Sequence, residues 1–157
     1  MRKSYSIMAI LFVSAFSFLC LTLSGQQVHT DLKDRFIGAW RLAWLEEPDA
    51  DGKIHKADCT GLLVYTHDGH MSVQVMYRNP HAREGGPVQY AQSGYEASFG
   101  TYQIDESTRT FTFHVEGAMV RSLIGKDLPR SFELSSNLLI VKSTNPNEHW
   151  RVAWEHY

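Results

Sequence analysis

The chain has 157 residues, of which 43% are hydrophobic and 12% aromatic, and its formal net charge at pH 7 is −2. A chain of this length and composition can form one domain around a single apolar core. A mildly acidic chain without a basic cluster has little with which to displace counterions from phosphates, so we expect no nucleic acid among its partners.

The first residues predict a secretory signal peptide. Arg2 and Lys3 form a charged start, and an uncharged apolar run follows over residues 7–23. This run is short for a transmembrane helix and ends in polar residues, which favours cleavage over retention as a membrane anchor, the alternative that stays open. We therefore expect residues 1–24 to be removed, residues 25–157 to form one domain without stable membrane insertion, and the protein to be periplasmic or secreted.

The first elements after this segment are a helix and a strand. Thr30 is a suitable N-cap, acidic residues follow it, and Gly38 ends the pattern, so we expect a short N-terminal helix. From Trp40 onward apolar residues alternate with polar ones. This alternation predicts a strand that places Trp40, Leu42 and Trp44 on one face.

A hairpin is predicted next, from the stretches "GLLVYT" and "HMSVQVM" on either side of Asp68-Gly69. Asp-Gly favours a two-residue type I′ turn, in which both central residues need positive φ. His67 and His70 would then form a cross-strand pair at the mouth of the hairpin. Because the neighbouring residues supply no third or fourth ligand by spacing, we expect no metal site there.

The remaining elements are a loop, a candidate lid and five strands. The stretch "RNPHAREGGPVQ" is rich in Pro and Gly and predicts a loop, and residues 88–97 predict either a short helix or an ordered loop that acts as a lid. The strands are "FGTYQID", "RTFTFHVEG", "RSFELS", "LLIVKST" and "HWRVAWEH". Eight short, mostly hairpin-connected strands predict an all-β fold, an eight-stranded antiparallel up-and-down barrel with room for side chains or one small ligand.

Several of these segments resemble, in order, the motifs of the small lipocalin-like domain family of bacteria and fungi. The segments are "FIGAWRL", "GLLVYTHDGHMSVQVMYRNP", "YEASFGTYQID", "FTFHVEGAM" and "PRSFELSSNLLIV", and the likeness runs from about Arg35 to Trp154. The resemblance implies an antiparallel barrel around a small-molecule cavity. It also implies that Trp40 closes one barrel end and that a late basic residue such as Arg151 covers it.

His114 and Glu116 are the candidate catalytic residues. They lie two apart in "FHVEG" and so share one face of a strand, while Phe111, Phe113 and Val115 share the other. If the aromatic face points inward, His114 and Glu116 face solvent. If the polar face lines the cavity, the imidazole and the carboxylate form a possible acid–base pair.

The strand "HMSVQVM" has the same ambiguity. One face carries Gln74 and Met76, and the other carries Met71, Val73 and Val75. If the first face lines the cavity, it forms a mixed wall with one amide group, which is usual for a small-molecule site. If the second does, Gln74 is solvated and Met76 lies at the rim.

Other candidates are tyrosines and one arginine. Tyr65, Tyr95 and Tyr102 would either pack in the core or supply aromatic walls with hydroxyl groups. Arg130 would pair with Glu116 or a ligand carboxylate if it points inward, and would otherwise be an exposed cation at the end of a strand. The candidate ligand-binding residues are therefore Tyr65, Gln74, Met76, Tyr95, Tyr102, His114 and Arg130.

The sequence leads to three hypotheses about function. In the first, an exported barrel binds a small apolar or amphipathic molecule, without cofactor or metal. In the second, a cofactor-free isomerase, cyclase or hydrolase acts in the same cavity through His114 and Glu116. In the third, side chains fill the barrel and its surface binds a protein partner.

Overall fold

The structure is a computed structural model of the chain that describes residues 31–49, 51–79 and 90–157. The predicted signal peptide and Thr30 lie outside the described residues. The strands are β1 (Gly38–Pro48), β2 (Ile54–Lys56), β3 (Cys59–Tyr65), β4 (His70–Tyr77), β5 (Tyr95–Asp105), β6 (Thr110–Ala118), β7 (Asp127–Leu134), β8 (Leu138–Ser143) and β9 (Arg151–His156). A 3-10 helix, η2 (Arg121–Leu123), lies between β6 and β7.

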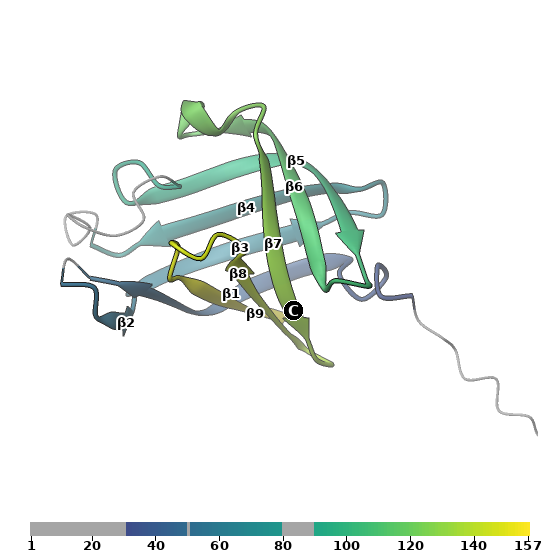
Figure 1. Cartoon of the computed structure of the whole chain (residues 1–157), viewed down its shortest axis with the longest axis horizontal. Helices are drawn as coiled ribbons and strands as arrows, with labels where there is room; N and C mark the ends of the chain where they lie inside the picture. The colour runs from purple at the N-terminus through teal and green to yellow at the C-terminus, as the bar shows by residue number, and fades with distance from the viewer. Residues whose placement is uncertain (1–30, 50, 80–89) are drawn as a thin grey trace, which may run out of the picture.

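The strands form one closed antiparallel barrel. Neighbours pair in the order β2-β1-β3-β4-β5-β6-β7-β8-β9, and β1 also pairs with β9. This last pairing closes the sheet, so that β1 and β3–β9 make an eight-stranded barrel (Figure 1). The short strand β2 pairs only with the end of β1. The predicted all-β, eight-stranded barrel is confirmed, and closure removes the exposed strand edges that an open sheet would have.

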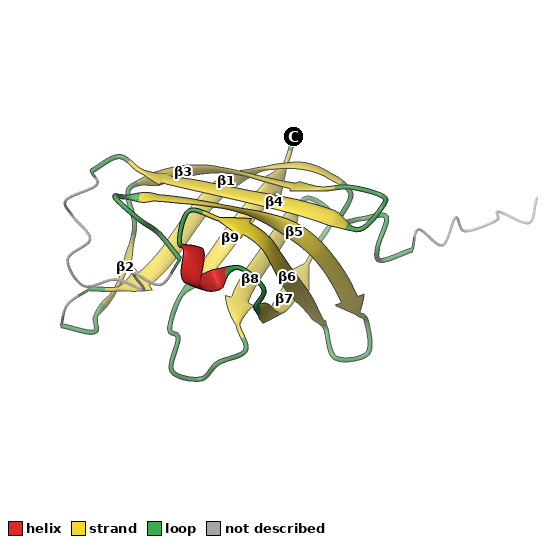
Figure 2. Cartoon of the chain, turned by 90° about the horizontal axis from the view of Figure 1, so that it is seen from above, coloured by secondary structure: helices red, strands yellow, loops and turns green. Residues whose placement is uncertain are grey.

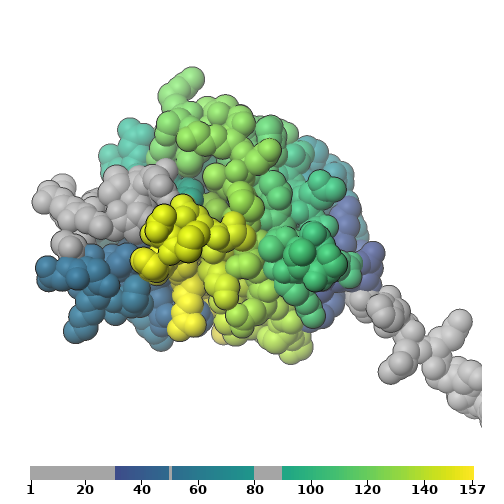
Figure 3. Space-filling view, viewed as in Figure 1, coloured from purple at the N-terminus to yellow at the C-terminus, as the bar shows by residue number. Residues whose placement is uncertain are grey.

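Alternation along each strand separates an apolar interior from a polar exterior. On β6, Phe111, Phe113 and Val115 are buried at 3%, 5% and 0% exposure, while the positions between them are exposed. Seen from above, the strands curve around this interior (Figure 2). The space-filling view shows the same side of the molecule, with the C-terminal part of the chain, in yellow, near the centre of the face (Figure 3).

Aromatic rings close one end of the barrel. Phe36, from the segment before β1, is fully buried, and its ring centroid lies 5.2 Å from that of Tyr65 and 4.9 Å from that of Phe132. The described part of this segment is a set of hydrogen-bonded turns, in which Phe36 N–H donates to Lys33 O at 3.0 Å, so the predicted regular helix is wrong for residues 31–37. Gly38, with φ of +129°, begins β1 immediately and ends the turns.

Trp40 closes the same end, but Arg151 does not cover it. Trp40 is 1% exposed, and its indole N–H donates to Phe36 O at 2.8 Å. The His156 ring packs edge-on against it, with centroids 4.7 Å apart. Arg151 instead lies over the ring of Trp44, with its guanidinium carbon 5.3 Å from the ring centroid. The covering residue is therefore His156.

A bulge in β1 changes which residues face inward. The register with β9 shifts between Leu42 and Trp44. Trp40 and Leu42 keep the inward face, but beyond the shift Leu45 and Glu47 are buried, while Trp44 lies on the outside. The prediction that Trp40, Leu42 and Trp44 share a face is wrong at Trp44, because a bulge inserts one residue and reverses the alternation.

The β3–β4 hairpin has a three-residue turn. Thr66 N–H donates to His70 O at 2.9 Å, and Gly69 N–H donates to Thr66 O at 3.2 Å. Gly69 has φ of +91°, whereas Asp68 has negative φ, so the predicted type I′ turn is wrong and the geometry is that of a type I turn followed by a glycine bulge. His67 lies within the turn and does not pair with His70 across it.

The candidate lid at residues 88–97 contains no helix in its described part, which starts at position 90. Gln92 and Tyr95 exchange two backbone hydrogen bonds, of 2.8 and 3.0 Å. Between them Ser93 and Gly94 have φ of 52° and 73°, which is the geometry of a tight I′-like turn. Two consecutive left-handed residues end any helix, and Tyr95 begins β5 directly.

Candidate functional site

A cavity lies inside the barrel. The short strand β2 and the helix η2 lie at the end of the barrel opposite the segment that precedes β1 (Figures 1 and 2). The cavity offers about 100 Å³ to the centres of water-sized molecules. Its wall is mainly apolar and comes from strands all around the barrel, including Leu63, Val75, Phe113, Val141 and Val152. Few polar groups interrupt this wall, which is the usual composition of a site for a small organic molecule.

Arg130, on β7, is the buried cation at this cavity. It is 8% exposed, and its guanidinium carbon lies 5.0 Å from the ring centroid of Tyr90 and 5.1 Å from that of Trp150. Its Nη1 donates to Pro129 O at 3.0 Å. Two aromatic faces attract a guanidinium through their negative quadrupoles, so the rings hold Arg130 in place without neutralising it.

Glu148 fixes both of these rings. Its Oε2 accepts a hydrogen bond from the Tyr90 hydroxyl at 2.9 Å and one from the Trp150 indole N–H at 3.0 Å. Asn145 donates to its Oε1 at 3.2 Å. Burial raises the pKa of Tyr90, while the charge of Arg130 opposes that rise. The β8–β9 connection thus positions the side chains that hold the guanidinium.

Tyr65, on β3, places a hydroxyl at the cavity without a hydrogen-bond partner among the described residues. The side chain is 1% exposed. Burial is the main cause that raises the pKa of Tyr65, with a further rise from Tyr102, while Arg130 lowers it. A neutral phenol that is fully buried and unpaired can donate a hydrogen bond to whatever enters the cavity.

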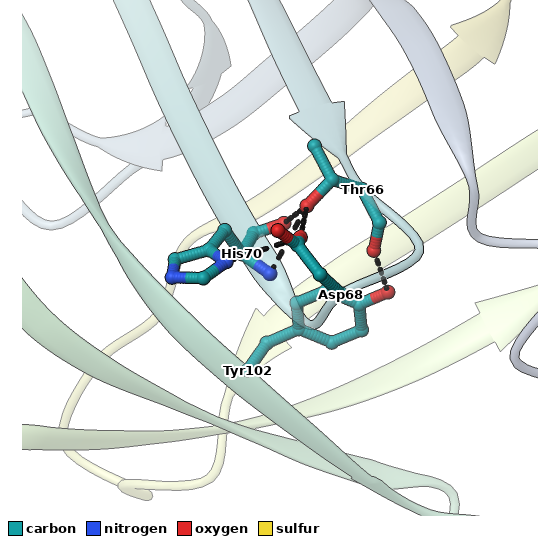
Figure 4. Close-up of polar contacts among 4 residues, drawn as sticks. All are labelled: Thr66, Asp68, His70 and Tyr102. Carbon is teal, nitrogen blue, oxygen red and sulfur yellow. Dashed lines mark hydrogen bonds and ion pairs between the residues drawn. The ribbon is translucent and has the colours of Figure 1, made fainter.

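Tyr102 supports Tyr65 from behind. The two ring centroids lie 4.8 Å apart, and the Tyr102 hydroxyl donates to Thr66 O at 3.1 Å, as Figure 4 shows. Tyr102 is buried, although it is not among the side chains that line the cavity. The β3–β4 turn accepts the hydrogen bond of the Tyr102 hydroxyl, so Tyr102 packs in the core and does not offer that hydroxyl to a ligand.

Glu47 is an acidic residue at the cavity that the sequence did not single out. It is 4% exposed, and the Tyr77 hydroxyl donates to its Oε2 at 3.1 Å. Its inward position follows from the bulge in β1, which strict alternation does not predict. The sequence also did not indicate that Tyr90 and Trp150 lie together at the cavity. One signal for Trp150 was available, because it alternates with Val152 and so shares the inward face of the last strand.

Gln74, Met76 and Tyr95 lie outside the barrel. Gln74 and Met76 are exposed on the outer face of β4, Met76 at 45%, while Val75 between them is buried. Tyr95 donates from its hydroxyl to Gln74 Oε1 at 3.3 Å on this outer surface. The structure therefore brings two of these candidates together but does not place any of the three at the cavity.

His114 and Glu116 also face outward. His114 Nδ1 lies 2.7 Å from Asp127 Oδ1, and the two side chains are 49% and 69% exposed. Glu116 is exposed on the same face of β6. Of the two interpretations of this strand, the structure shows the one with the aromatic face inward, so the candidate acid–base pair is not at the cavity.

The β3–β4 turn holds a separate polar cluster on the surface. Asp68 Oδ1 lies 3.0 Å from His70 Nδ1 and also accepts a hydrogen bond from the Thr66 hydroxyl (Figure 4). The hydrogen bond from Thr66, then that from His70, lowers the pKa of Asp68 to about 2. The hydrogen bond and charge of Asp68 raise the pKa of His70. Both side chains lie on the surface, at 54% exposure for His70 and 71% for Asp68, and the cluster stabilises the turn.

Two general features complete the description. In residues 31–49, 51–79 and 90–157, no three His, Cys, Asp or Glu side chains gather as metal ligands would. Over the same ranges the chain has no helix with the length and apolar character needed to span a membrane.

Comparisons with known proteins gave structural similarities and one family match. A crystal structure of a lipocalin-like protein from Bacteroides uniformis ATCC 8492 is 13% identical, with a TM-score of 0.48 over 78% of this chain and 99% of that one. A redesigned beta barrel is 10% identical, with a TM-score of 0.43 over 80% of this chain and 94% of that one. No curated protein gave a sequence match. The family model of the lipocalin-like domain matches residues 37–156, so this chain belongs to the lipocalin-like domain family.

Proposed function

We propose that this protein binds one small, mostly apolar or amphipathic organic molecule inside its barrel. The observation that carries the proposal is the cavity inside the barrel, whose apolar wall is interrupted by a few polar groups. An eight-stranded barrel can hold one small ligand in this way, and membership of the lipocalin-like family supports small-molecule binding in general.

A matched pair of variants on β8 tests this proposal. Val141 is 5% exposed and lines the cavity, while the next residue, Lys142, points outward. Val141→Phe adds volume inside the cavity, and Lys142→Phe adds the same ring outside it. With 1-octanol as the probe in calorimetric titrations, we expect one bound molecule per chain, a loss of at least about tenfold in affinity for Val141→Phe, and little change for Lys142→Phe.

The opposite pattern would contradict the proposal. Equal binding to both variants, or binding of several octanol molecules with the same weak affinity, would mean that the probe adsorbs to the outer surface. Circular dichroism of both variants checks that the added ring has not unfolded the barrel.

We also propose that the protein is exported. The support is the charged start followed by the apolar run of residues 7–23. If the full chain is expressed in a bacterial host, the intact mass of the periplasmic product should lack residues 1–24. A full-length product that stays with the membrane fraction would favour an uncleaved anchor instead.

A further inference from the structure

Arg130 carries a buried positive charge without an acidic partner. Among the described residues, no carboxylate forms an ion pair with it, and Glu148 is engaged by Tyr90 and Trp150. A guanidinium has five N–H donors: Nη1 donates to Pro129 O, and a hydrogen bond to the Tyr90 hydroxyl engages a second part of the group. Because burial of an unpaired charge is costly, a group at the cavity that neutralises Arg130 would be strongly favoured.

Tyr65 faces Arg130 across the barrel. In the closed ring of eight strands, β3 and β7 are four places apart in either direction, so the two side chains enter from opposite walls. The charge of Arg130 acts on the Tyr65 hydroxyl, which places the two groups within electrostatic reach of each other. Both side chains line the same cavity, and the hydroxyl is unpartnered and fully buried. Two donor groups thus line one cavity, and among the described residues neither of them has a carboxylate partner.

We propose that the molecule bound in the cavity carries a carboxylate, which accepts hydrogen bonds from the Arg130 guanidinium and from the Tyr65 hydroxyl. This inference rests on the proposed function and names the class of its ligand: a small organic acid with an apolar body. A planar carboxylate matches the fork of a guanidinium and can accept two N–H bonds from it, while the phenol adds a third bond. The apolar body would contact the wall formed by residues such as Val75 and Val141.

The acidic side chains near the cavity do not argue for a cationic ligand instead. Glu47 and Glu96 line the cavity and both are engaged by partners, Glu47 by the Tyr77 hydroxyl, while Glu148 accepts two hydrogen bonds from the rings that hold Arg130. Tyr65 and Arg130, which line the same cavity, can both donate hydrogen bonds. An ammonium group would leave the Tyr65 hydroxyl without an acceptor and would be repelled by Arg130.

The experiment compares three probes that share one alkyl chain and differ in the head group: octanoate, 1-octanol and octylamine. Each is titrated into the wild-type protein at neutral pH by calorimetry, with tryptophan fluorescence as a second readout because Trp150 and Trp154 line the cavity. We expect octanoate to bind at least about tenfold more tightly than 1-octanol, and octylamine to bind more weakly than either.

Variants assign this preference to the two donors. Arg130→Met should abolish the preference for octanoate over 1-octanol, and Tyr65→Phe should reduce this preference several-fold without removing the ring. Arg121→Met is the matched control, because Arg121 is an exposed arginine in η2. It should keep the full preference.

The outcomes separate this inference from the proposed function. If octanoate and 1-octanol bind the wild type equally, or octylamine binds most tightly, the carboxylate is wrong while a cavity ligand stands. If no probe binds the wild type, both proposals fail. The head-group comparison uses the wild-type protein, so it tests the carboxylate proposal even if Arg130→Met does not fold. In that case Arg130→Lys tests whether a positive charge alone preserves the preference for octanoate.

Discussion

Tyr65 and Arg130 reach into the same cavity from strands on opposite walls of the barrel, and each is more than nine-tenths buried. One presents a phenol without a hydrogen-bond partner, and the other presents a guanidinium without an acidic partner among the described residues. An arrangement of this kind lowers the stability of the empty protein and favours a ligand that satisfies both groups. A substitution that removes one of these unsatisfied groups should therefore raise the unfolding free energy of the empty protein and lower its affinity for the ligand.

Tyr65→Phe should make the empty protein more stable. The substitution keeps the ring, with its contacts to Phe36 and Tyr102, and removes a buried hydroxyl that has no partner. Since an unsatisfied buried polar group costs about 1–3 kcal/mol, we expect the free energy of unfolding to rise by about 1 kcal/mol in urea titrations. Tyr102→Phe is the matched control and should lower it, because that hydroxyl donates to Thr66 O. A less stable Tyr65→Phe protein would show that the hydroxyl is satisfied in solution.

Glu148→Ala should loosen the rings around Arg130. The substitution removes the acceptor shared by Tyr90 and Trp150. We expect the free energy of unfolding to fall by about 1–3 kcal/mol, the range for hydrogen bonds to a charged group, together with a weaker affinity for octanoate. Glu133→Ala removes an exposed acid paired with Lys142 at 3.6 Å and should change stability by less than about 1 kcal/mol. If the two variants behave alike, Glu148 does not organise the site.

His114→Ala should leave binding intact. The imidazole is half exposed on the outer face of β6, and its contact with Asp127 is a surface interaction of a kind worth about 0–1 kcal/mol. We expect titrations with 1-octanol and octanoate to give wild-type affinities. A large loss of affinity would mean that the outer face of β6 takes part in the site.

The turn cluster should make stability depend on pH in a defined window. The pKa of Asp68 is lowered from 3.8 to about 2, so its contribution is present above pH 3.8 and is lost as the pH falls towards 2. The pKa of His70 is raised above 6.5, so its contribution is present below 6.5 and is lost as the pH rises through the folded-state pKa. Wild type and Asp68→Asn should therefore differ most in unfolding free energy between about pH 4 and 6.

An NMR titration of the His70 ring measures the same coupling directly. In the wild type its pKa should lie above the ordinary value of 6.5, and Asp68→Asn should bring it down, because the first cause of the rise is the hydrogen bond with Asp68. An unchanged His70 pKa in Asp68→Asn would show that the two side chains do not interact in solution.

The barrel could be predicted from the sequence because its strands carry a local signal. Alternation with a period of two marks the eight strands, and in β6 it also identifies the buried face through Phe111, Phe113 and Val115. The bulge in β1 could not be predicted, because it arises from pairing with β9 over a hundred residues away. It reverses the faces of Trp44, Leu45 and Glu47 and so brings an acid into the interior.

The candidate site was predictable only in part, for a similar reason. Tyr65 and Arg130 were both candidates, and both line the cavity. Both faces of β4 carry residues that would suit a pocket. The alternation of residues along the strand therefore did not show that Gln74 lies on the outside of the barrel. The rings that hold Arg130 come from segments sixty residues apart, Tyr90 before β5 and Trp150 before β9, and only the closed barrel brings them together.

The most direct test of a ligand inside the barrel is a crystal structure of the protein with octanoate. The account predicts an alkyl chain in the cavity, beside Val75 and Val141, with the carboxylate within hydrogen-bond distance of the Arg130 guanidinium and the Tyr65 hydroxyl. Octanoate bound only on the outer surface, for instance over the exposed side chains of Phe99 and Met119, with the cavity left empty, would contradict it.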